Sequence, residues 1–465
     1  MTTAGPVPAL SLAPLGIRTA FQQKGVGSAL TLQGLLECTR LGHRIVICVG
    51  HPKFYQRFGF VPARASGLEL PFPAPDDVFL VRELVPDAMK GITGLVRYPD
   101  ARWGLMHDDV YPSGKIHLRQ SRFSGRDPGM CVIQGWVEVN GRRLRYDEIT
   151  DVCTNSPAEM AHFGGEFYIS GGGCQARDRY GIIPGPVPKG TVFCRDYPRV
   201  PVKPDPPSMG LEEAIIQSVS LRSDEGVTAL SGGVDSSLVA RLAGLPCVVV
   251  GTAGAHDLKQ AETAAGVLGL QCEQVILTAA HIEDALTTVL GLIPDRTPVH
   301  ASIATTLYCV AEWASNRGYR RVLTGQGADE LFGGYARYLS TPTLEADLTR
   351  DFLELEKQAA RDQAVAGVHN IWFSYPYLDT RVVRAAKTIP SEEKVYRGVR
   401  KWALRTVAER YIPKNIAWYD KKAMQYGSGV WNVIRDLARH NGYKRSVQGY
   451  INQISEREHG NRAGR

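Results

Sequence analysis

The sequence predicts an α/β protein with a doubly wound parallel sheet and a helical C-terminal part, preceded by a small β-rich domain. From Gly210 onward, apolar runs of strand length alternate with helical patterns. This alternation is typical of a parallel sheet covered by helices on both faces. Residues 131–139 instead alternate apolar and polar side chains, as a half-buried strand does. The 465 residues are enough for two or three domains.

Six segments are expected along the chain. Residues 1–99 contain a predicted strand at 9–15, a helix at 28–41 and a strand at 44–49, and residues 100–129 have the composition of a linker. The β-rich piece covers 130–197, and a proline-rich, extended connector covers 198–209. The α/β domain follows at 210–440, and a charged tail at 441–465 is expected to fray over 455–465.

Within the α/β domain the elements alternate in order, and residues 340–440 look mainly helical. The predicted strands are 227–230, 247–251, 271–277 and 320–323, and the predicted helices are 236–242, 258–268, 279–292 and 303–315. Ligands of such sheets bind at the carboxyl ends of the strands. The segments that follow strands 227–230 and 320–323 are therefore the candidate site.

A glycine-serine loop leads from the first strand into the first helix. It reads Leu230-Ser231-Gly232-Gly233-Val234-Asp235-Ser236-Ser237. Free N–H groups at a helix start attract a phosphate, and glycines let it approach the backbone. An aspartate beside a phosphate needs a cation, so ATP with Mg²⁺ is implied. The alternative is a serine-glycine turn after a buried strand. No lysine follows the glycines, so this is not the P-loop that serves γ-phosphate transfer.

A second loop follows the strand at 320–323. It reads Thr324-Gly325-Gln326-Gly327-Ala328-Asp329-Glu330-Leu331-Phe332-Gly333-Gly334-Tyr335. Asp329 would lie at the same sheet edge as Asp235, and two aspartates facing one pyrophosphate are compatible only with a metal between them. The alternative is a helix cap in which Asp329 and Glu330 favour the helix dipole.

The two loops together resemble the synthetase domain of asparagine synthetases and their relatives. The first loop is similar to the pyrophosphate loop of N-type ATP pyrophosphatases, whose sheet is of the adenine nucleotide alpha-hydrolase or PP-loop type. Further matches to the family follow in order at Val250-Gly251, Asp257-Leu258-Lys259, Ala301-Ser302-Ile303, Tyr375-Pro376-Tyr377-Leu378-Asp379, Arg400-Lys401-Trp402-Ala403-Leu404-Arg405 and Ile412-Pro413-Lys414-Asn415-Ile416. The resemblance covers about 210–435.

The resemblance implies that the chain adenylates a carboxylate, usually the aspartate side chain, and that an amine then displaces AMP. The implied ATP-binding residues are Leu230, Ser231, Gly232, Gly233, Asp235, Ser236, Val250, Thr324 and Gly325, with Asp235 and Asp329 as Mg²⁺ ligands. Lys421 matches a family lysine that stabilises negative charge during the attack on the acyl-adenylate. The adjacent Lys422 leaves this register open by one residue.

One position departs from the family pattern. The family usually has glutamate where this chain has Gln326, and an amide cannot take a proton from the incoming ammonium. Three alternatives are open: Gln326 orients the substrate, another group accepts the proton, or the product is not asparagine.

The β-rich piece resembles a shortened class II glutaminase domain, through Met130-Cys131-Val132-Ile133, Phe163-Gly164-Gly165-Glu166-Phe167 and the run 176–184. In the full domain the nucleophile is an N-terminal cysteine whose own amine is the base. Cys131 is internal, and glutamine-binding and oxyanion segments have no counterpart. We expect a structural remnant, with free ammonia as the nitrogen donor.

The N-terminal piece resembles the second half of a GNAT acetyltransferase. Gln22, Gly25 and Gly27 match its pyrophosphate loop for acetyl-CoA, and residues 51–60 match a later segment. The opening half of that fold is missing, so we expect a truncated fragment, with a CoA-binding remnant as the alternative.

Composition limits the remaining classes. The net charge is +7, but the sequence has no basic patch interleaved with aromatic residues. No apolar run is of membrane-span length. Nine cysteines without a CxxC pair predict reduced thiols and a cytoplasmic protein. The expected partners are small-molecule substrates, with neither nucleic acid nor membrane; a homo-oligomer is left open.

Three functions are consistent with the sequence. The first is an ATP-dependent ligase that makes asparagine from aspartate and ammonia, or a related adenylating ligase with a different acceptor. The second is an acetyltransferase acting through the N-terminal piece. The third is a nucleotide-binding regulatory protein that has lost its chemistry.

Overall fold

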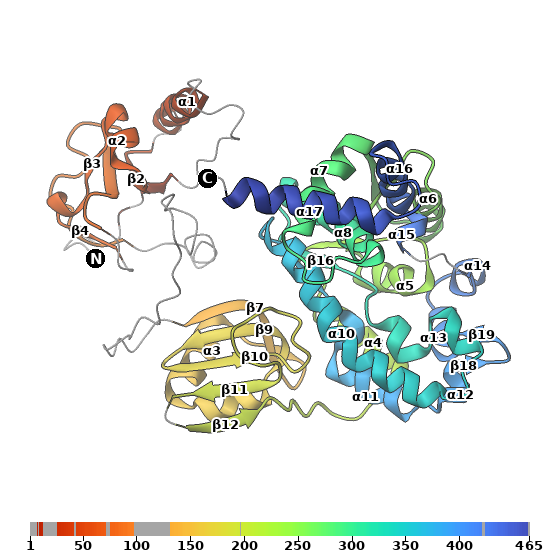
Figure 1. Cartoon of the computed structure of the whole chain (residues 1–465). Helices are drawn as coiled ribbons and strands as arrows, with labels where there is room; N and C mark the ends of the chain where they lie inside the picture. Colours follow the sequence, from red (N-terminus) through yellow and green to blue (C-terminus); the bar gives the residue numbers. More distant parts are fainter. Residues whose placement is uncertain are drawn as a thin grey trace. The chain divides into compact units, whose positions relative to one another are not determined.

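A computed structural model describes residues 7, 9–12, 26–40, 43–70, 75–96, 131–195, 197–420 and 424–463 (Figure 1). The chain divides into two compact units, residues 1–123 and 124–465, which are described separately. The predicted linker at 100–129 lies outside the described residues.

The first unit contains a small mixed sheet in the order β1-β2-β5-β3. Strand β2 pairs parallel to β1 and antiparallel to β5. The predicted helix at 28–41 and strand at 44–49 are confirmed as α1 and β2, and β1 lies within the predicted strand at 9–15. The elements are β1 (Leu10–Ser11), α1 (Val26–Arg40), β2 (Ile45–Val49), α2 (Pro52–Tyr55), β3 (Val61–Pro62), β4 (Leu68–Glu69), β5 (Phe79–Glu83) and β6 (Gly94–Leu95).

The second unit begins with a six-stranded antiparallel sheet, in the order β12-β11-β10-β9-β7-β8, which we call the β domain (Figure 1). Its core contains Ile149 of α3 and Phe167 and Ile169 of β9. The alternating β-like runs of the sequence are thus confirmed as strands. The elements are β7 (Val132–Val139), β8 (Arg142–Arg143), α3 (Tyr146–Asn155), β9 (Gly164–Gly171), β10 (Cys174–Arg177), β11 (Thr191–Cys194) and β12 (Tyr197–Pro201).

The start of the predicted proline-rich connector belongs to this sheet. Strand β12 includes Pro198 and Pro201 and pairs with β11 on one side only. An edge strand tolerates proline because the missing N–H can face away from the ladder.

The α/β domain is built on a five-stranded parallel sheet in the order β15-β14-β13-β16-β17. Its strands are β13 (Val227–Ala229), β14 (Cys247–Thr252), β15 (Cys272–Leu277), β16 (Arg321–Leu323) and β17 (Trp372–Ser374). The strand order reverses between β13 and β16, so this is a doubly wound sheet, and ligands bind at such a switch point. The predicted fold class is confirmed.

Alternate side chains of β14 show how helices cover both faces. Val248 and Val250 pack in one core cluster with residues of α7 and α8, whereas Cys247 and Val249 pack in another with residues of α6. Full burial of an aliphatic side chain contributes about 1.5–3 kcal/mol. Helices α5 (Val234–Ala243), α6 (His256–Leu268), α7 (Ala279–Leu290) and α8 (Pro298–Asn316) confirm the four predicted helices.

The remaining elements of this domain are mainly helical, as expected for 340–440. They are α4 (Leu211–Ser220), α9 (Ala328–Phe332), α10 (Leu344–Gly367), α11 (Thr380–Thr388), α12 (Ser391–Lys394), α13 (Trp402–Ala408), α14 (Lys414–Ala417), α15 (Met424–Gly427), α16 (Val430–His440), α17 (Val447–Ala463) and the hairpin of β18 (Val395–Tyr396) and β19 (Val399–Arg400). Strand β17 was not expected, because three residues are too few to show a strand period.

The expectation of a charged tail at 441–465 needs correction. Helix α17 covers Val447–Ala463, and Tyr450, Ile451 and Ile454 are buried in the core cluster of the α/β domain, whereas the fraying expected over 455–465 stays a prediction. Three apolar residues at helical spacing bury one face of this charged helix, so the segment assigned to a tail packs on the domain.

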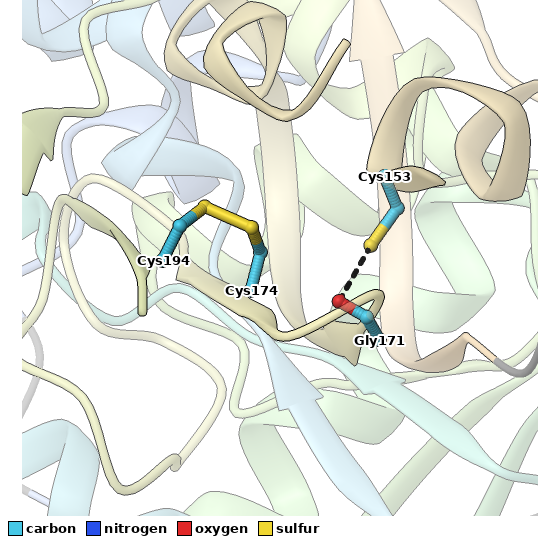
Figure 2. Close-up of a disulfide and its surroundings, with 4 residues drawn as sticks. All are labelled: Cys153, Gly171, Cys174 and Cys194. Atoms are coloured by element: carbon cyan, nitrogen blue, oxygen red, sulfur yellow. Dashed lines mark hydrogen bonds between the residues drawn. A yellow bond between two sulfur atoms is a disulfide. The ribbon is translucent and has the colours of Figure 1, made fainter. Parts of the chain in front are cut away.

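The expectation of uniformly reduced thiols is also wrong at one pair. Cys174 and Cys194 form a disulfide, whereas the other seven cysteines are free. The two residues face each other directly in the antiparallel pairing of β10 and β11 (Figure 2). Their separation of 20 residues matches no motif, so only the register of the two strands reveals the pair.

No helix within the described ranges has the length and apolar character needed to cross a membrane.

Candidate functional site

The loop after β13 forms a closed serine turn at the start of α5. The backbone N–H of Ser231 donates to Oγ of Ser236 at 3.1 Å, and the two hydroxyl oxygens lie 2.8 Å apart. Gly233 is the N-cap of α5 and supplies no side-chain cap. The first N–H groups of α5 are therefore not used by a capping side chain, as an anion site requires.

The loop after β16 packs directly on this turn. A Cβ at Gly325 would lie 2.8 Å from Cβ of Asp235 and 3.1 Å from the backbone nitrogen of Ser236. These separations are too short for a side chain, so Gly325 lets the two loops touch. The structure thus brings together the two motifs that the sequence placed at one sheet edge.

Asp235 and Asp329 meet at a shared cation, the ammonium of Lys401. Nζ of Lys401 lies 2.6 Å from Oδ2 of Asp235 and 2.7 Å from Oδ1 of Asp329. Burial alone would lower the pKa of Lys401, but the two aspartates outweigh it and raise this pKa above its ordinary value. The lysine therefore stays charged. Sequence reasoning gave Lys401 no role, although it noted the motif around it.

Gly334 allows Lys401 to approach Asp329 this closely. A Cβ at Gly334 would lie 1.8 Å from Oδ1 of Asp329 and 2.2 Å from Cε of Lys401. Any side chain at Gly334 would therefore push the lysine off the aspartates.

The two aspartates fit a magnesium ion. One ammonium contacts both, so both are close enough to share one cation, and Oδ1 of Asp235 is buried without a hydrogen-bond partner among the described residues. Mg²⁺ is commonly held by one or two carboxylates together with substrate phosphates and water. The described residues contain no cluster of three or more His, Cys, Asp or Glu around a metal position.

The residues assigned to the nucleotide lie around these loops. Leu230 and Val250 are buried at or near the carboxyl ends of β13 and β14. Thr324 follows β16, and its N–H donates to the carbonyl oxygen of Ser374 at 3.1 Å. Ser231, Gly232, Gly233, Asp235, Ser236 and Gly325 belong to the touching loops.

Gln326 is tied to a buried carboxylate that the sequence did not reveal. Its Nε2 donates to Oδ2 of Asp362 on α10 at 3.3 Å, and the hydroxyl of Tyr375 donates to the same oxygen at 3.3 Å. Arg361 contacts the other oxygen at 2.6 Å. Burial raises the pKa of Asp362, although Arg361 opposes this shift. The signal in the sequence was only an aspartate within a helical pattern.

Several predicted residues lie outside the described part of the chain: Lys421, Lys422, Gln22 and Gly25. Gly27 lies in the first turn of α1, where its carbonyl accepts a hydrogen bond from the Thr31 hydroxyl at 2.8 Å.

Cys131 directly precedes β7 and is buried. Its hydrogen bond with Cys153 and its burial raise the pKa of the Cys131 thiol above the ordinary value. The thiolate needed for nucleophilic attack is therefore disfavoured, in agreement with the interpretation of Cys131 as a structural residue.

The comparisons with known proteins match the part that carries this site. The asparagine synthase family model matches residues 210–366 and 355–458. A putative glutamine-hydrolysing asparagine synthetase of Methanocaldococcus jannaschii is 31% identical over 291 residues, 53% of this chain and 54% of that protein. Asparagine synthetase B of Escherichia coli is 28% identical over 238 residues, 45% of this chain and 43% of that protein.

The chain spans about half the length of these curated relatives. Among solved structures, a GNAT family N-acetyltransferase from Escherichia coli in complex with CoA is 33% identical, with a TM-score of 0.20, covering 21% of this chain and 55% of that one. The asparagine synthase model covers more than half of the chain, so the resemblance seen in the two loops is confirmed, and the chain belongs to the asparagine synthase family.

Proposed function

We propose that the chain is an ATP-dependent ligase that adenylates the side-chain carboxylate of aspartate and transfers ammonia to it. The observation that carries this proposal is the meeting of Asp235 and Asp329 at one cation position, beside the serine turn of α5. That arrangement fits a pyrophosphate bound through Mg²⁺. The proposed products are asparagine, AMP and pyrophosphate.

The two half-reactions use different parts of the site. In the first, a carboxylate oxygen attacks the α-phosphorus of ATP and pyrophosphate leaves. Ser231, Ser236 and the first N–H groups of α5 would hold the pyrophosphate, and Lys401 offers a positive charge next to it. Bound Mg²⁺ would neutralise phosphate charge between Asp235 and Asp329.

In the second half-reaction an amine attacks the acyl carbon and AMP leaves. Nε2 of Gln326 donates to Asp362, so Oε1 is the amide atom that would accept an N–H of the amine. Asp362 is hydrogen-bonded to Gln326, and its ionised form accepts from both Gln326 and Tyr375. The first sequence alternative is thereby favoured: Gln326 would orient the amine, and Asp362 would hold Gln326 in place.

Free ammonia is the proposed nitrogen donor because Cys131 is internal and buried. The cluster of Gln326, Asp362 and Tyr375 would select the amine. Because Gln326 departs from the family pattern, a related ligase with a different acceptor is the second candidate.

The test is a mass-spectrometric assay of the full chain with Mg-ATP, ammonium and aspartate labelled with heavy oxygen in its side chain. Adenylation transfers one labelled oxygen to AMP, whereas hydrolysis of ATP by water leaves AMP unlabelled. Labelled AMP together with asparagine is the expected result. Labelled AMP without asparagine would indicate a different amine, and the absence of labelled AMP would refute adenylation of aspartate. Acetyl transfer from acetyl-CoA would favour the N-terminal acetyltransferase instead.

A further inference from the structure

A buried network of charges joins the β domain to the α/β domain. Its members are all at most 3% exposed in their side chains: Glu138, Glu166, Arg222, Asp379 and Arg381. The two glutamates belong to β7 and β9, and the other three residues follow α4, precede α11 or lie within it. The β domain, which we interpret as a catalytically inert remnant, thus contributes charge to the interior of the α/β domain.

Glu166 accepts four hydrogen bonds in this network. Its Oε1 accepts hydrogen bonds from Nε of Arg222 at 2.8 Å and from the backbone N–H of Tyr375 at 2.9 Å. Its Oε2 accepts from Nε1 of Trp136 at 3.2 Å and from the hydroxyl of Ser374 at 2.6 Å. Only an ionised carboxylate can accept from four donors in this way, so the site is specific for this group.

The contacts of Glu166 reach the carboxyl end of β17. The cluster of Gln326, Asp362 and Tyr375, which we call the amide-forming cluster, begins there. Ser374 is the last residue of β17, and its carbonyl accepts the N–H of Thr324. The next residue, Tyr375, donates its hydroxyl to Asp362, which in turn holds Gln326. The path from Glu166 to Gln326 is therefore a continuous series of hydrogen bonds through the backbone and ring of Tyr375.

We propose that Glu166 is a positioning residue for the amide-forming step, so that the β domain is an obligatory part of the synthetase site although it hydrolyses no glutamine. The inference rests on the proposed function. Glu166 sets the end of β17, and Tyr375 and Asp362 transmit that position to Gln326. The adenylation half is expected to depend on Glu166 less, because Asp235, Asp329 and Lys401 belong to other elements, although Thr324 contacts Ser374 through its backbone N–H.

The test compares Glu166→Gln with a matched variant, Glu138→Gln. A glutamine keeps the shape of Glu166 but turns two of its four acceptor positions into donors, which face N–H or O–H groups. Glu138→Gln also removes a buried charge between the domains, the partner of Arg381 at 2.8 Å, without touching β17. Each variant is measured for pyrophosphate exchange into ATP with aspartate, and for asparagine formation with ammonium.

The expected result for Glu166→Gln is a fall of about 10-fold or more in the kcat of asparagine formation relative to exchange, since misplacement by about 1 Å can cost about 100-fold. Glu138→Gln is expected to keep the native ratio, even where it lowers thermal stability. Equal ratios in the native chain and both variants, or equal falls in both variants, would overturn the proposal. If Glu166→Gln does not fold, Ser374→Ala, which removes a single hydrogen bond from Glu166, takes its place.

Amide hydrogen exchange gives a readout that needs no substrate. Glu166→Gln should speed exchange in residues 372–378 and at Thr324, whose N–H donates to Ser374, and Glu138→Gln should not. If the native chain shows no pyrophosphate exchange, the proposed function fails, and hydrogen exchange still decides whether Glu166 holds this segment. Unchanged exchange rates in Glu166→Gln would refute the positioning role.

Discussion

Replacing Lys401 by methionine should convert the chain into a protein whose stability depends on Mg²⁺. In the native chain the ammonium contacts both Asp235 and Asp329, and Lys401→Met leaves the two carboxylates facing each other. Loss of one partner of a buried ion pair costs about 3–5 kcal/mol. The side chain of Asp329 is 42% exposed, so water relieves part of this cost and we expect about 2–3 kcal/mol.

The expected fall in Tm without metal is about 5–10 °C, because each kcal/mol shifts Tm by about 2–4 °C for a domain of this size. Mg²⁺ should restore it. A ligand that binds only the folded state at 100 times its Kd adds about 2.7 kcal/mol, which equals the loss. The native chain should gain less from Mg²⁺ in the absence of ATP, because Lys401 already occupies the cation position.

The assay is thermal unfolding at neutral pH, with a chelator and then along a Mg²⁺ titration. Neutral pH is safe because the folded pKa of Lys401 is raised: its stabilisation is complete below the ordinary value of 10.5 and is lost only as pH rises through the higher folded value. Lys394→Met is the matched control, since burial lowers the pKa of this buried lysine on the neighbouring helix α12. If Lys401→Met is as stable as the native chain in chelator, or if Mg²⁺ raises the Tm of both variants equally, the shared cation position is refuted.

Three further predictions concern the two half-reactions. Asp235→Asn or Asp329→Asn should reduce pyrophosphate exchange by at least about 100-fold, and near-native exchange in either variant would contradict the metal assignment. Because burial raises the pKa of Asp362, the ionised form that holds Gln326 is lost as pH falls through that raised value; asparagine formation should rise with pH through it, and Asp362→Asn should remove this limb of the profile and slow the step by about 100-fold. Lys421→Ala should cut product formation while sparing folding; if only Lys422→Ala does so, the register of the family match is shifted by one residue.

The parts of the site that could be predicted from the sequence are those in which the signal is local. The turn at Ser231–Ser236 is formed by adjacent residues, and the glycine-rich segment around Asp329 is also contiguous in the sequence. Parallel topology then brings both to one edge, because each follows a strand of the same sheet. No knowledge of distant contacts was needed for this step.

The parts of the site that the sequence did not predict are those whose contacts are distant in sequence. Lys401 is separated from Asp235 by 166 residues and Glu166 from Tyr375 by 209. A lysine or glutamate in such a position looks like a solvated surface charge when its partners are unknown. Strand β17 could not be predicted either, because its three residues pair with β16 and the long helix α10 separates the two strands in the sequence.

The two charge clusters differ in what they allow. Glu166 satisfies four donors in a buried position, and any movement would leave at least one of them unpaired, at about 1–3 kcal/mol each. This cluster therefore favours a single arrangement. Lys401 instead makes two ion pairs to carboxylates that are partly exposed, and a phosphate oxygen can replace a carboxylate as its partner. Under the proposed function, Lys401 would neutralise Asp235 and Asp329 before the nucleotide binds and the pyrophosphate afterwards, so the cluster of the adenylation step would exchange partners while the cluster of the amide-forming step stays fixed.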